Sequence, residues 1–404
     1  MQHKPKQKRQ NMKQTFTVIF IYIFGITFAQ NDAIVDANKL IENKKYESAI
    51  KVLNDADPTN ENPVIVIAKT DLYLKYFVTS IMHKMFALTD LEPDQDVMDI
   101  RGSEGSFAMF AFAPDSVLNP LIDKYPDNYN LRKSLGYYYH EVHLKYQQNW
   151  LEPDSIVINR FFDNYKIAYE NGIYDYWSAY GLGYAYLMQQ DYQSAIPYLE
   201  KSTELKNDYP SSYYNLAYAY LYTDQREKGI ESAKTAMDIY DYPQYKADAA
   251  RMIAVMYREL KDSENAIDFY KQADKIQPND YYTLKPLLDI ELSLNKENYQ
   301  DRTEQFFSIA PGNPTIYQDL MKMYWSYEKV DELLDFLTSQ HDNYLSDNKV
   351  NGNLYFYKAM ILYDKENFTD SKTNFEKSRE IFKKVYEPNH RVFEVIDSYT
   401  DEIQ

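Results

Sequence analysis

The chain has 404 residues, a formal net charge of −17 at neutral pH, 10 glycines and no cysteine. The low glycine content argues against a sandwich or barrel with many tight turns. The lack of cysteine excludes disulfides, thiolate metal sites, cysteine nucleophiles and lipid attachment through an N-terminal cysteine. The acidic balance disfavours nucleic acid and anionic membranes as partners.

The first 29 residues have the pattern of a signal peptide. Five basic residues come first: Lys4, Lys6, Lys8, Arg9 and Lys13. The apolar run Phe16 to Ala29 follows and is shorter than the roughly 20 residues of a membrane-spanning helix. Cleavage is predicted after Ala29 or Gln30, which implies a periplasmic or secreted protein with no stable membrane insertion. An uncleaved anchor is the alternative, and Met12 is an alternative start to Met1.

Residues 30–128 are predicted to form divergent helical repeats. Asp32 to Pro58 reads as one helix pair, whereas Leu88 to Pro114 has no repeat pattern and is predicted as a loop at 88–114, either a linker or a functional loop. Three acidic residues in that loop have a spacing that raises a calcium hypothesis: Asp94, Asp96 and Asp99. The loop lacks the glycine and the ligand series of a calcium-binding hand, so no calcium site is predicted.

Residues 129–174 are predicted as an extended helix pair. Leu135-Gly136 and Tyr139 indicate close packing of its first helix, and Pro153-Asp154 favours the start of the second. His140 and His143 lie near one face with Glu141 between them, but a metal site needs a further ligand. These histidines are therefore interpreted as packing residues.

Residues 176–280 contain a repeat. Small residues recur with a step of 34 and then a step of 37 residues, in three independent series: Gly183, Ala217 and Ala254; Ala195, Gly229 and Ala266; Ser202, Ala236 and Ala273. Small residues at such positions allow two antiparallel helices to approach closely. Short polar turns separate the helices of each pair.

This pattern resembles the tetratricopeptide repeat, whose period is 34 residues. The resemblance implies an all-α fold, a right-handed α-α superhelix (solenoid) of antiparallel helix pairs. It is strongest over 176–280, read as three well-matched repeats. Three further repeats are expected over 281–385, the first of them degenerate, and a capping helix over 389–404.

The resemblance also implies where a ligand binds. In this family the first helix of each pair lines the concave side, which predicts a groove rich in aromatic side chains. The predicted groove residues are Trp177, Tyr180, Tyr184, Met188, Tyr214, Tyr218, Tyr222, Arg251 and Arg258. Of the residues with which some relatives clamp a C-terminal carboxylate, only Asn215 matches, so that mode of carboxylate binding is not expected.

The sequence contains no nucleophile elbow, phosphate-binding loop, dinucleotide fingerprint or zinc-protease motif. We therefore expect no enzyme activity, no cofactor and no metal. The favoured function is an exported scaffold that binds a protein or extended peptide in the aromatic groove. The alternatives are a glycan-binding module in polysaccharide capture, based on the aromatic groove, and an envelope hydrolase, based on the acidic density near 88–114.

Overall fold

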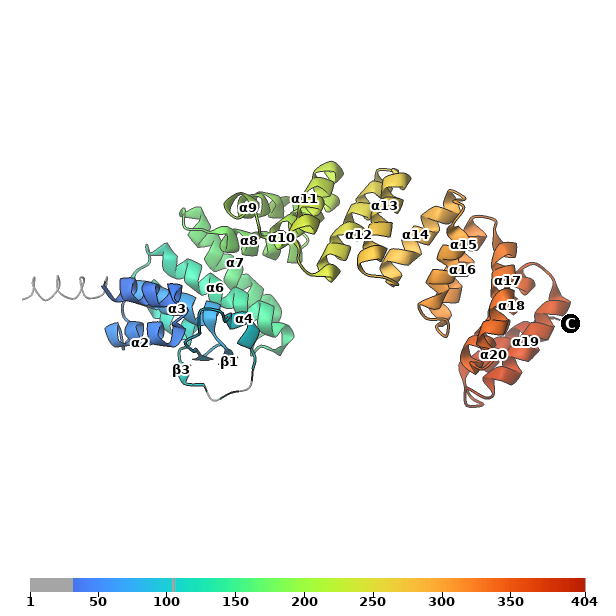
Figure 1. The fold of residues 1–404 in the computed structure, drawn as a ribbon, viewed down its shortest axis with the longest axis horizontal. Coiled ribbons are helices and arrows are strands. Elements are labelled where there is room, and N and C mark those ends of the chain that lie inside the picture. Colours follow the sequence, from blue (N-terminus) through green and yellow to red (C-terminus); the bar gives the residue numbers. More distant parts are fainter. Residues whose placement is uncertain (1–31, 104, 106, 404) are drawn as a thin grey trace, which may run out of the picture. The chain divides into compact units, whose positions relative to one another are not determined.

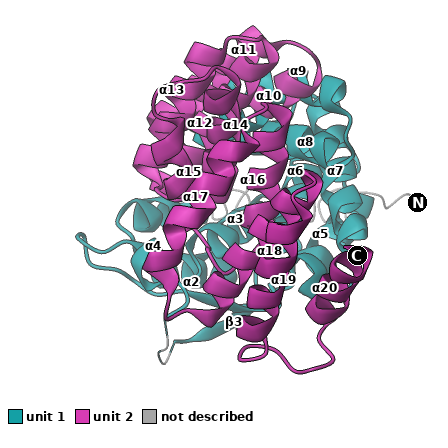
Figure 2. Ribbon diagram, turned by 90° about the vertical axis from the view of Figure 1, so that its right-hand side faces the viewer, with its two compact units in different colours: residues 1–215 teal, residues 216–404 magenta. Residues whose placement is uncertain are grey.

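The structure is a computed structural model that describes residues 32–103, 105 and 107–403 (Figure 1). The predicted signal peptide lies outside these residues. The chain divides into two units, residues 1–215 and 216–404 (Figure 2), and each unit is described by itself. Both units consist of antiparallel helix pairs that follow one another along the chain. The predicted all-α solenoid is thereby confirmed.

The first unit begins with a helix over residues 32–42. Its further helices are α2 (Tyr46–Ala56), α3 (Pro63–Tyr76), α4 (Val97–Ile100), α5 (Pro114–Lys124), α6 (Tyr129–Tyr146), η1 (Gln147–Asn149), α7 (Asp154–Glu170), α8 (Tyr176–Met188) and α9 (Tyr192–Leu205). Helix α10 (Pro210–Tyr222) contains the division between the units.

The second unit continues with pairs of the same kind and ends in a single helix. Its helices are α11 (Arg226–Ile239), α12 (Pro243–Glu259), α13 (Ser263–Ile276), α14 (Tyr281–Ser293), α15 (Tyr299–Ser308), α16 (Pro314–Ser326), α17 (Val330–Ser339), η2 (Gln340–Tyr344), α18 (Asn348–Asp364), α19 (Phe368–Phe382) and α20 (Arg391–Glu402). Helix α20 covers most of the segment in which the sequence predicts a cap. Helix α15, in the copy described as degenerate, has only ten residues.

The turn within a helix pair follows a recurring local rule. After the first helix, one residue adopts the left-handed conformation, as Gln190 (φ 60°), Asp224 (φ 63°) and Lys261 (φ 61°) do. That conformation ends a helix because it redirects the chain after the last turn. In two of these turns an aspartate then caps the next helix: the Asp191 side chain accepts a hydrogen bond from the Ser194 amide, and the Asp262 side chain accepts one from the Asn265 amide.

Small residues allow the two helices of a pair to approach. In the α8–α9 pair, a Cβ atom on Gly183 would lie 2.5 Å from the Leu199 side chain. Leu199 and Ala195 are fully buried there, and the buried Ser202 hydroxyl donates to the Tyr176 carbonyl at 2.8 Å. The repeat markers found in the sequence are thus the contact points between helices.

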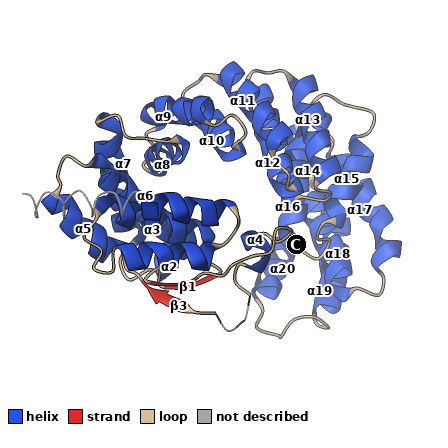
Figure 3. Cartoon of the chain, turned by 60° about the vertical axis from the view of Figure 1, so that its left-hand side comes forward, coloured by secondary structure: helices blue, strands red, loops and turns tan. Residues whose placement is uncertain are grey.

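A small β-sheet interrupts the second helix pair, between α3 and α5 (Figure 3). Strands β1 (Thr79–Ile81), β2 (Met85–Ala87) and β3 (Met109–Ala111) pair antiparallel in the order β1-β2-β3. Tyr73 of α3 stacks on Phe86 and Phe112, with ring centroids 5.1 and 4.9 Å apart, which attaches the sheet to the helices.

The structure therefore differs from the loop predicted over 88–114, because α4 and β3 lie within it. A three-residue strand carries too short an alternation of apolar residues to be recognised. Its partner, β2, lies more than 20 residues earlier, so only the tertiary pairing defines β3.

None of the helices within the described residues is long and apolar enough to cross a membrane.

Candidate ligand-binding site

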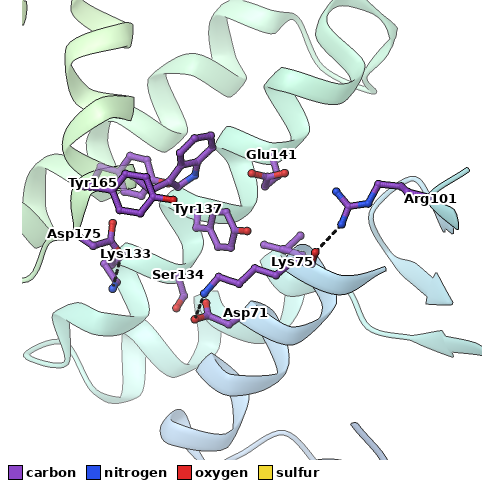
Figure 4. Close-up of a pocket in the computed structure, with 12 residues that line it drawn as sticks. Asp71, Lys75, Arg101, Lys133, Ser134, Tyr137, Glu141, Tyr165 and Asp175 are labelled. Carbon is purple, nitrogen blue, oxygen red and sulfur yellow. Dashed lines mark hydrogen bonds and ion pairs between the residues drawn. The ribbon is translucent and has the colours of Figure 1, made fainter. Parts of the chain in front are cut away.

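A cavity of about 380 Å³ lies within the first unit (Figure 4). Its walls come mainly from the first helices of successive pairs, α3, α6 and α8, and α6 packs against both of the others. The lining side chains are Asp71, Leu74 and Lys75 of α3; Arg101; Lys133, Ser134, Tyr137 and Glu141 of α6; Tyr165 of α7; and Asp175, Tyr176 and Trp177 at the start of α8.

Tyr165 forms the floor of the cavity because two glycines leave room for its ring. A Cβ atom would lie 2.5 Å from that ring at Gly136 of α6, and 2.7 Å from it at Gly181 of α8. No real side chain tolerates contacts this short, so both positions require glycine while the ring stays in place. The ring is fully enclosed, with 1% of the residue exposed.

Two of the three cations in the lining form ion pairs with aspartates of the lining. Lys75 pairs with Asp71 at 3.1 Å, and Lys133 pairs with Asp175 at 2.9 Å. Burial alone would raise the pKa of Asp175, but Lys133 and the hydrogen bonds from Ser178 hold it below its usual value. The same carboxylate caps helix α8. Each of these two pairs is neutral, so together they contribute no net charge to the wall.

Arg101, the third cation, comes from the insertion between α3 and α5. Its guanidinium donates to the carbonyl oxygens of Lys75 at 2.6 Å and Phe77 at 3.2 Å, and it lies 4.3 Å from the centre of the Phe77 ring. These contacts fix its position without an opposing carboxylate, and burial lowers its pKa. The insertion thus contributes to the cavity lining a cation that the helix pairs alone do not supply.

Glu141 supplies the third carboxylate of the lining. No hydrogen bond or ion pair to it is formed within the described part of the chain. Burial raises the pKa of Glu141 to about 7, against the opposing effect of Arg101 and Lys145. Near neutral pH the carboxyl group therefore exchanges between its protonated and ionised forms.

Three buried polar atoms of the lining have no hydrogen-bond partner among the residues described: Ser134 Oγ, Tyr165 Oη and Trp177 Nε1. Ser134 and Tyr165 are each 1% exposed. A buried polar group without a partner costs about 1–3 kcal/mol, so such groups concentrate where another molecule binds. Figure 4 shows the labelled side chains of Tyr137, Tyr165 and Glu141 around one space.

The two histidines that raised a metal hypothesis have separate structural roles. His140 is stacked between Phe161 and Trp177, with ring centroids 4.8 and 4.9 Å away, and burial lowers its pKa to about 3. His143 bonds to Asp154 at 2.7 Å and to the Tyr184 hydroxyl at 3.1 Å. In the part of the chain that the structure describes, no cluster of His, Cys, Asp and Glu could hold a metal ion.

The groove residues predicted on α8 lie in different environments. Trp177 lines the cavity, Tyr180 is only 8% exposed, and Tyr184 is held by His143. Met188 is exposed, and the amide of Asn215 donates to the Tyr180 hydroxyl at 3.3 Å. The start of the predicted groove is thus part of an aromatic stack rather than a free surface.

The remaining predicted residues lie on α10 and α12. Tyr214 and Tyr218 are half-buried, whereas Tyr222 and Arg258 are exposed. Arg251 forms ion pairs with Asp248 and, at 3.1 Å, with Asp280. Its charge is therefore balanced within the second unit.

Sequence reasoning missed Ser134, Tyr137 and Glu141 as site residues. They stand at i, i+3 and i+7, which places them on one face of α6. Their shared helical spacing was a detectable signal, although α6 carries other polar residues as well. Arg101 offered none, because its approach to α6 depends on the insertion.

Comparison with known families matches the tetratricopeptide repeat at residues 178–209, 210–241 and 248–280. The chain therefore contains three such repeats, and its resemblance to this family is confirmed for these residues. Repeats of this kind typically serve as scaffolds for protein–protein interaction. The fold therefore indicates a protein of the interaction-scaffold class.

Three solved structures are similar to part of this chain. A crystal structure of MamA is 21% identical, with 40% of this chain and 85% of that chain covered and a TM-score of 0.34. MamA 41-end from Desulfovibrio magneticus RS-1 is 15% identical, with 45% and 93% covered and a TM-score of 0.36. A tetratricopeptide repeat protein from Parabacteroides merdae is 15% identical, with 62% and 93% covered and a TM-score of 0.37. No curated protein matches the chain.

Proposed function

We propose that this protein is an exported scaffold that binds a protein or an extended peptide along the first helices of its repeats and catalyses no reaction itself. The observation that carries the proposal is the cavity between α3, α6 and α8, whose buried hydroxyls have no partner within the described chain. A peptide offers carbonyl and amide groups to such atoms and apolar side chains to the rings beside them.

Exposed apolar side chains on first helices of both units support the same proposal. Met188 in the first unit is 50% exposed, and Tyr282 and Trp325 in the second unit are 75% and 39% exposed. Large apolar side chains that stay in contact with water on a binding face favour a partner that covers them. Each unit thus offers apolar contacts of its own, in addition to those of the cavity in the first unit.

Export is supported by the basic and apolar leader over residues 1–29. Cell fractionation followed by N-terminal sequencing tests it. A mature chain that begins at Gln30 or Asn31 in the envelope or medium would support export. A chain that retains Phe16 to Ala29 would contradict cleavage and favour a membrane anchor.

The binding proposal is tested by photo-crosslinking in the native cells. A photoreactive residue replaces Trp177 in the cavity or, as a control, Glu204, which lies exposed on the second helix α9. A protein that crosslinks at 177 but not at 204, and that binds again when both proteins are purified, would support the scaffold. Capture of only a glycan at position 177 would contradict it in favour of the glycan module.

A further inference from the structure

The charges around the cavity do not balance when Glu141 is protonated. The two lysine–aspartate pairs cancel, and Arg101 then leaves one positive charge. The whole chain has a net charge of −17, whereas the cavity lining then has a net positive charge. A positive charge within an acidic protein is what a site needs in order to attract an anion.

The unpaired atoms of the lining are hydrogen-bond donors. Trp177 Nε1 can only donate, and the hydroxyls of Ser134 and Tyr165 are free to donate. Arg101 has five N–H groups, of which Nε and Nη2 bond to the carbonyls of Lys75 and Phe77. Protonated Glu141 adds one more O–H donor. A ligand with acceptor oxygens would satisfy these groups.

We propose that the cavity binds one carboxylate group of the partner, and that binding is coupled to a proton held at Glu141. This inference rests on the proposed function, since it assumes that the cavity is where the partner binds. A carboxylate brings the single negative charge that the lining lacks, and its two oxygens match the planar N–H fork of Arg101. A protonated Glu141 donates to the carboxylate, whereas an ionised Glu141 repels it.

Several charged or titratable groups from every neighbouring element surround Glu141. They are Tyr137 and Lys145 on its own helix; Arg101 from the insertion; Asp71 and Lys75 on α3; Tyr165 on α7; Asp175 at the start of α8; and His83 between β1 and β2. Burial holds His83 neutral by lowering its pKa to about 3. Lys145 donates to Ser80 at 2.7 Å. Burial raises the pKa of Glu141 to about 7, so the charge of Glu141 changes near neutral pH.

A second cavity of about 380 Å³ shares Arg101 and Glu141 with the first. The two residues stand where both spaces meet, so a carboxylate bound there leaves room on either side for the rest of the partner. Phe77 and Leu144 line the second cavity and offer apolar contact. The site therefore fits a carboxylate carried on a larger, partly apolar group.

The test is calorimetric titration of the purified protein with three small probes that share one aromatic ring. N-acetyl-phenylalanine carries a carboxylate, its amide is neutral, and phenethylamine is a cation. The acid should bind at least about tenfold tighter than the amide, since a charged acceptor doubles the strength of each hydrogen bond. Equal affinity for acid and amide, or preferential binding of the amine, would overturn the proposal.

The pH dependence and two variants test the role of Glu141 separately. Above about pH 7 the affinity for the acid should fall about tenfold per pH unit, because binding takes up one proton. Glu141→Gln should bind the acid at pH 8 as the unchanged protein does at pH 6, without pH dependence. Affinity that rises with pH, or a Gln variant that no longer binds, would contradict the proton coupling.

Arg101→Met should weaken binding of the acid at least about tenfold, as expected when one charged hydrogen-bond donor is lost. Arg132→Met is the matched control: Arg132 lies on α6 beside Lys133 but bonds to Asn164 outside the lining, and its replacement should leave affinity unchanged. If Arg101→Met does not fold, the Glu141→Gln variant still tests the proposal. If both Arg variants bound the acid with equal affinity, Arg101 would have no role in binding the carboxylate.

Two peptides identify the source of the carboxylate. One has a free C-terminus and no acidic side chain; the other has an internal glutamate and an amidated C-terminus. Binding of either supports a carboxylate site, and binding of neither contradicts it. If the probes fail while a protein still crosslinks at position 177, this inference falls and the scaffold stands. If they bind while no protein crosslinks, the scaffold falls instead.

Discussion

The ring of Tyr165 fills the space beside Gly136 that any larger residue would need: a Cβ atom there would lie 2.5 Å from the ring. This contact holds α7 against α6 and places the Tyr165 hydroxyl in the cavity lining. The same contact therefore packs two helices together and forms part of the site.

Gly136→Ala should lower the free energy of unfolding by about 1–3 kcal/mol, because the added methyl group must displace a fully buried ring. Urea unfolding followed by circular dichroism measures the change. Gly312→Ala is the control, since a Cβ atom there meets only the flexible Lys349 side chain at 3.6 Å. Equal stability of the two variants would show that the α6–α7 contact is looser than described.

Tyr165→Phe should leave the unfolding free energy unchanged or raise it, because the hydroxyl that it removes has no partner within the described chain. Tyr324→Phe is the matched comparison: Tyr324 is 2% exposed, and its hydroxyl shares a hydrogen bond of 2.7 Å with Thr303. That variant should lose about 1 kcal/mol. A similar loss in both would reveal a partner for Tyr165 in the free protein.

Glu141 should make the protein less stable as pH rises. Its folded pKa of about 7 lies above the value of 4.5 of an unperturbed glutamate, so the folded state holds the proton more tightly. The resulting stability is present below about pH 4.5 and is lost as pH rises through 7. The loss amounts to about 3 kcal/mol, and Glu141→Gln should remove it.

The measurement is the difference in unfolding free energy between the Glu141→Gln variant and the unchanged protein at pH 5 and pH 8. Glu204→Gln removes an exposed carboxylate from the same unit and serves as the control. A difference that stays constant between the two pH values would show that Glu141 is ionised throughout and would remove the basis of proton coupling.

Tyr184→Ala and Met188→Ala separate the half-buried part of the predicted groove from its exposed part. Tyr184 bonds to His143, and their ring centroids lie 5.5 Å apart, so its truncation should cost about 2–4 kcal/mol. Met188 on the same helix is 50% exposed and should cost less than about 0.5 kcal/mol. Thermal unfolding of both variants checks this. A fully stable Tyr184→Ala protein would restore Tyr184 as a free groove residue.

Local pattern was enough to predict the helix pairs and the repeats. The spacing of Gly183, Ala217 and Ala254 indicates where helices approach, because a small residue acts at its own position whatever the distant chain does. The resemblance to a known repeat also placed the binding face on the first helices. It selected α8, α10 and α12, whereas the cavity lies further upstream, between α3 and α8.

The sequence by itself determined the helices, their turns and their pairing with neighbours, because these depend on residues at most about 40 positions apart and on a repeated pattern. Only the tertiary structure decided that Arg101, carried by an insertion without repeat character, reaches the same cavity as Glu141. It also decided that the rings around His140 stack on one another. Such contacts follow no repeated pattern in the sequence, and they form only when the core between the helices has closed.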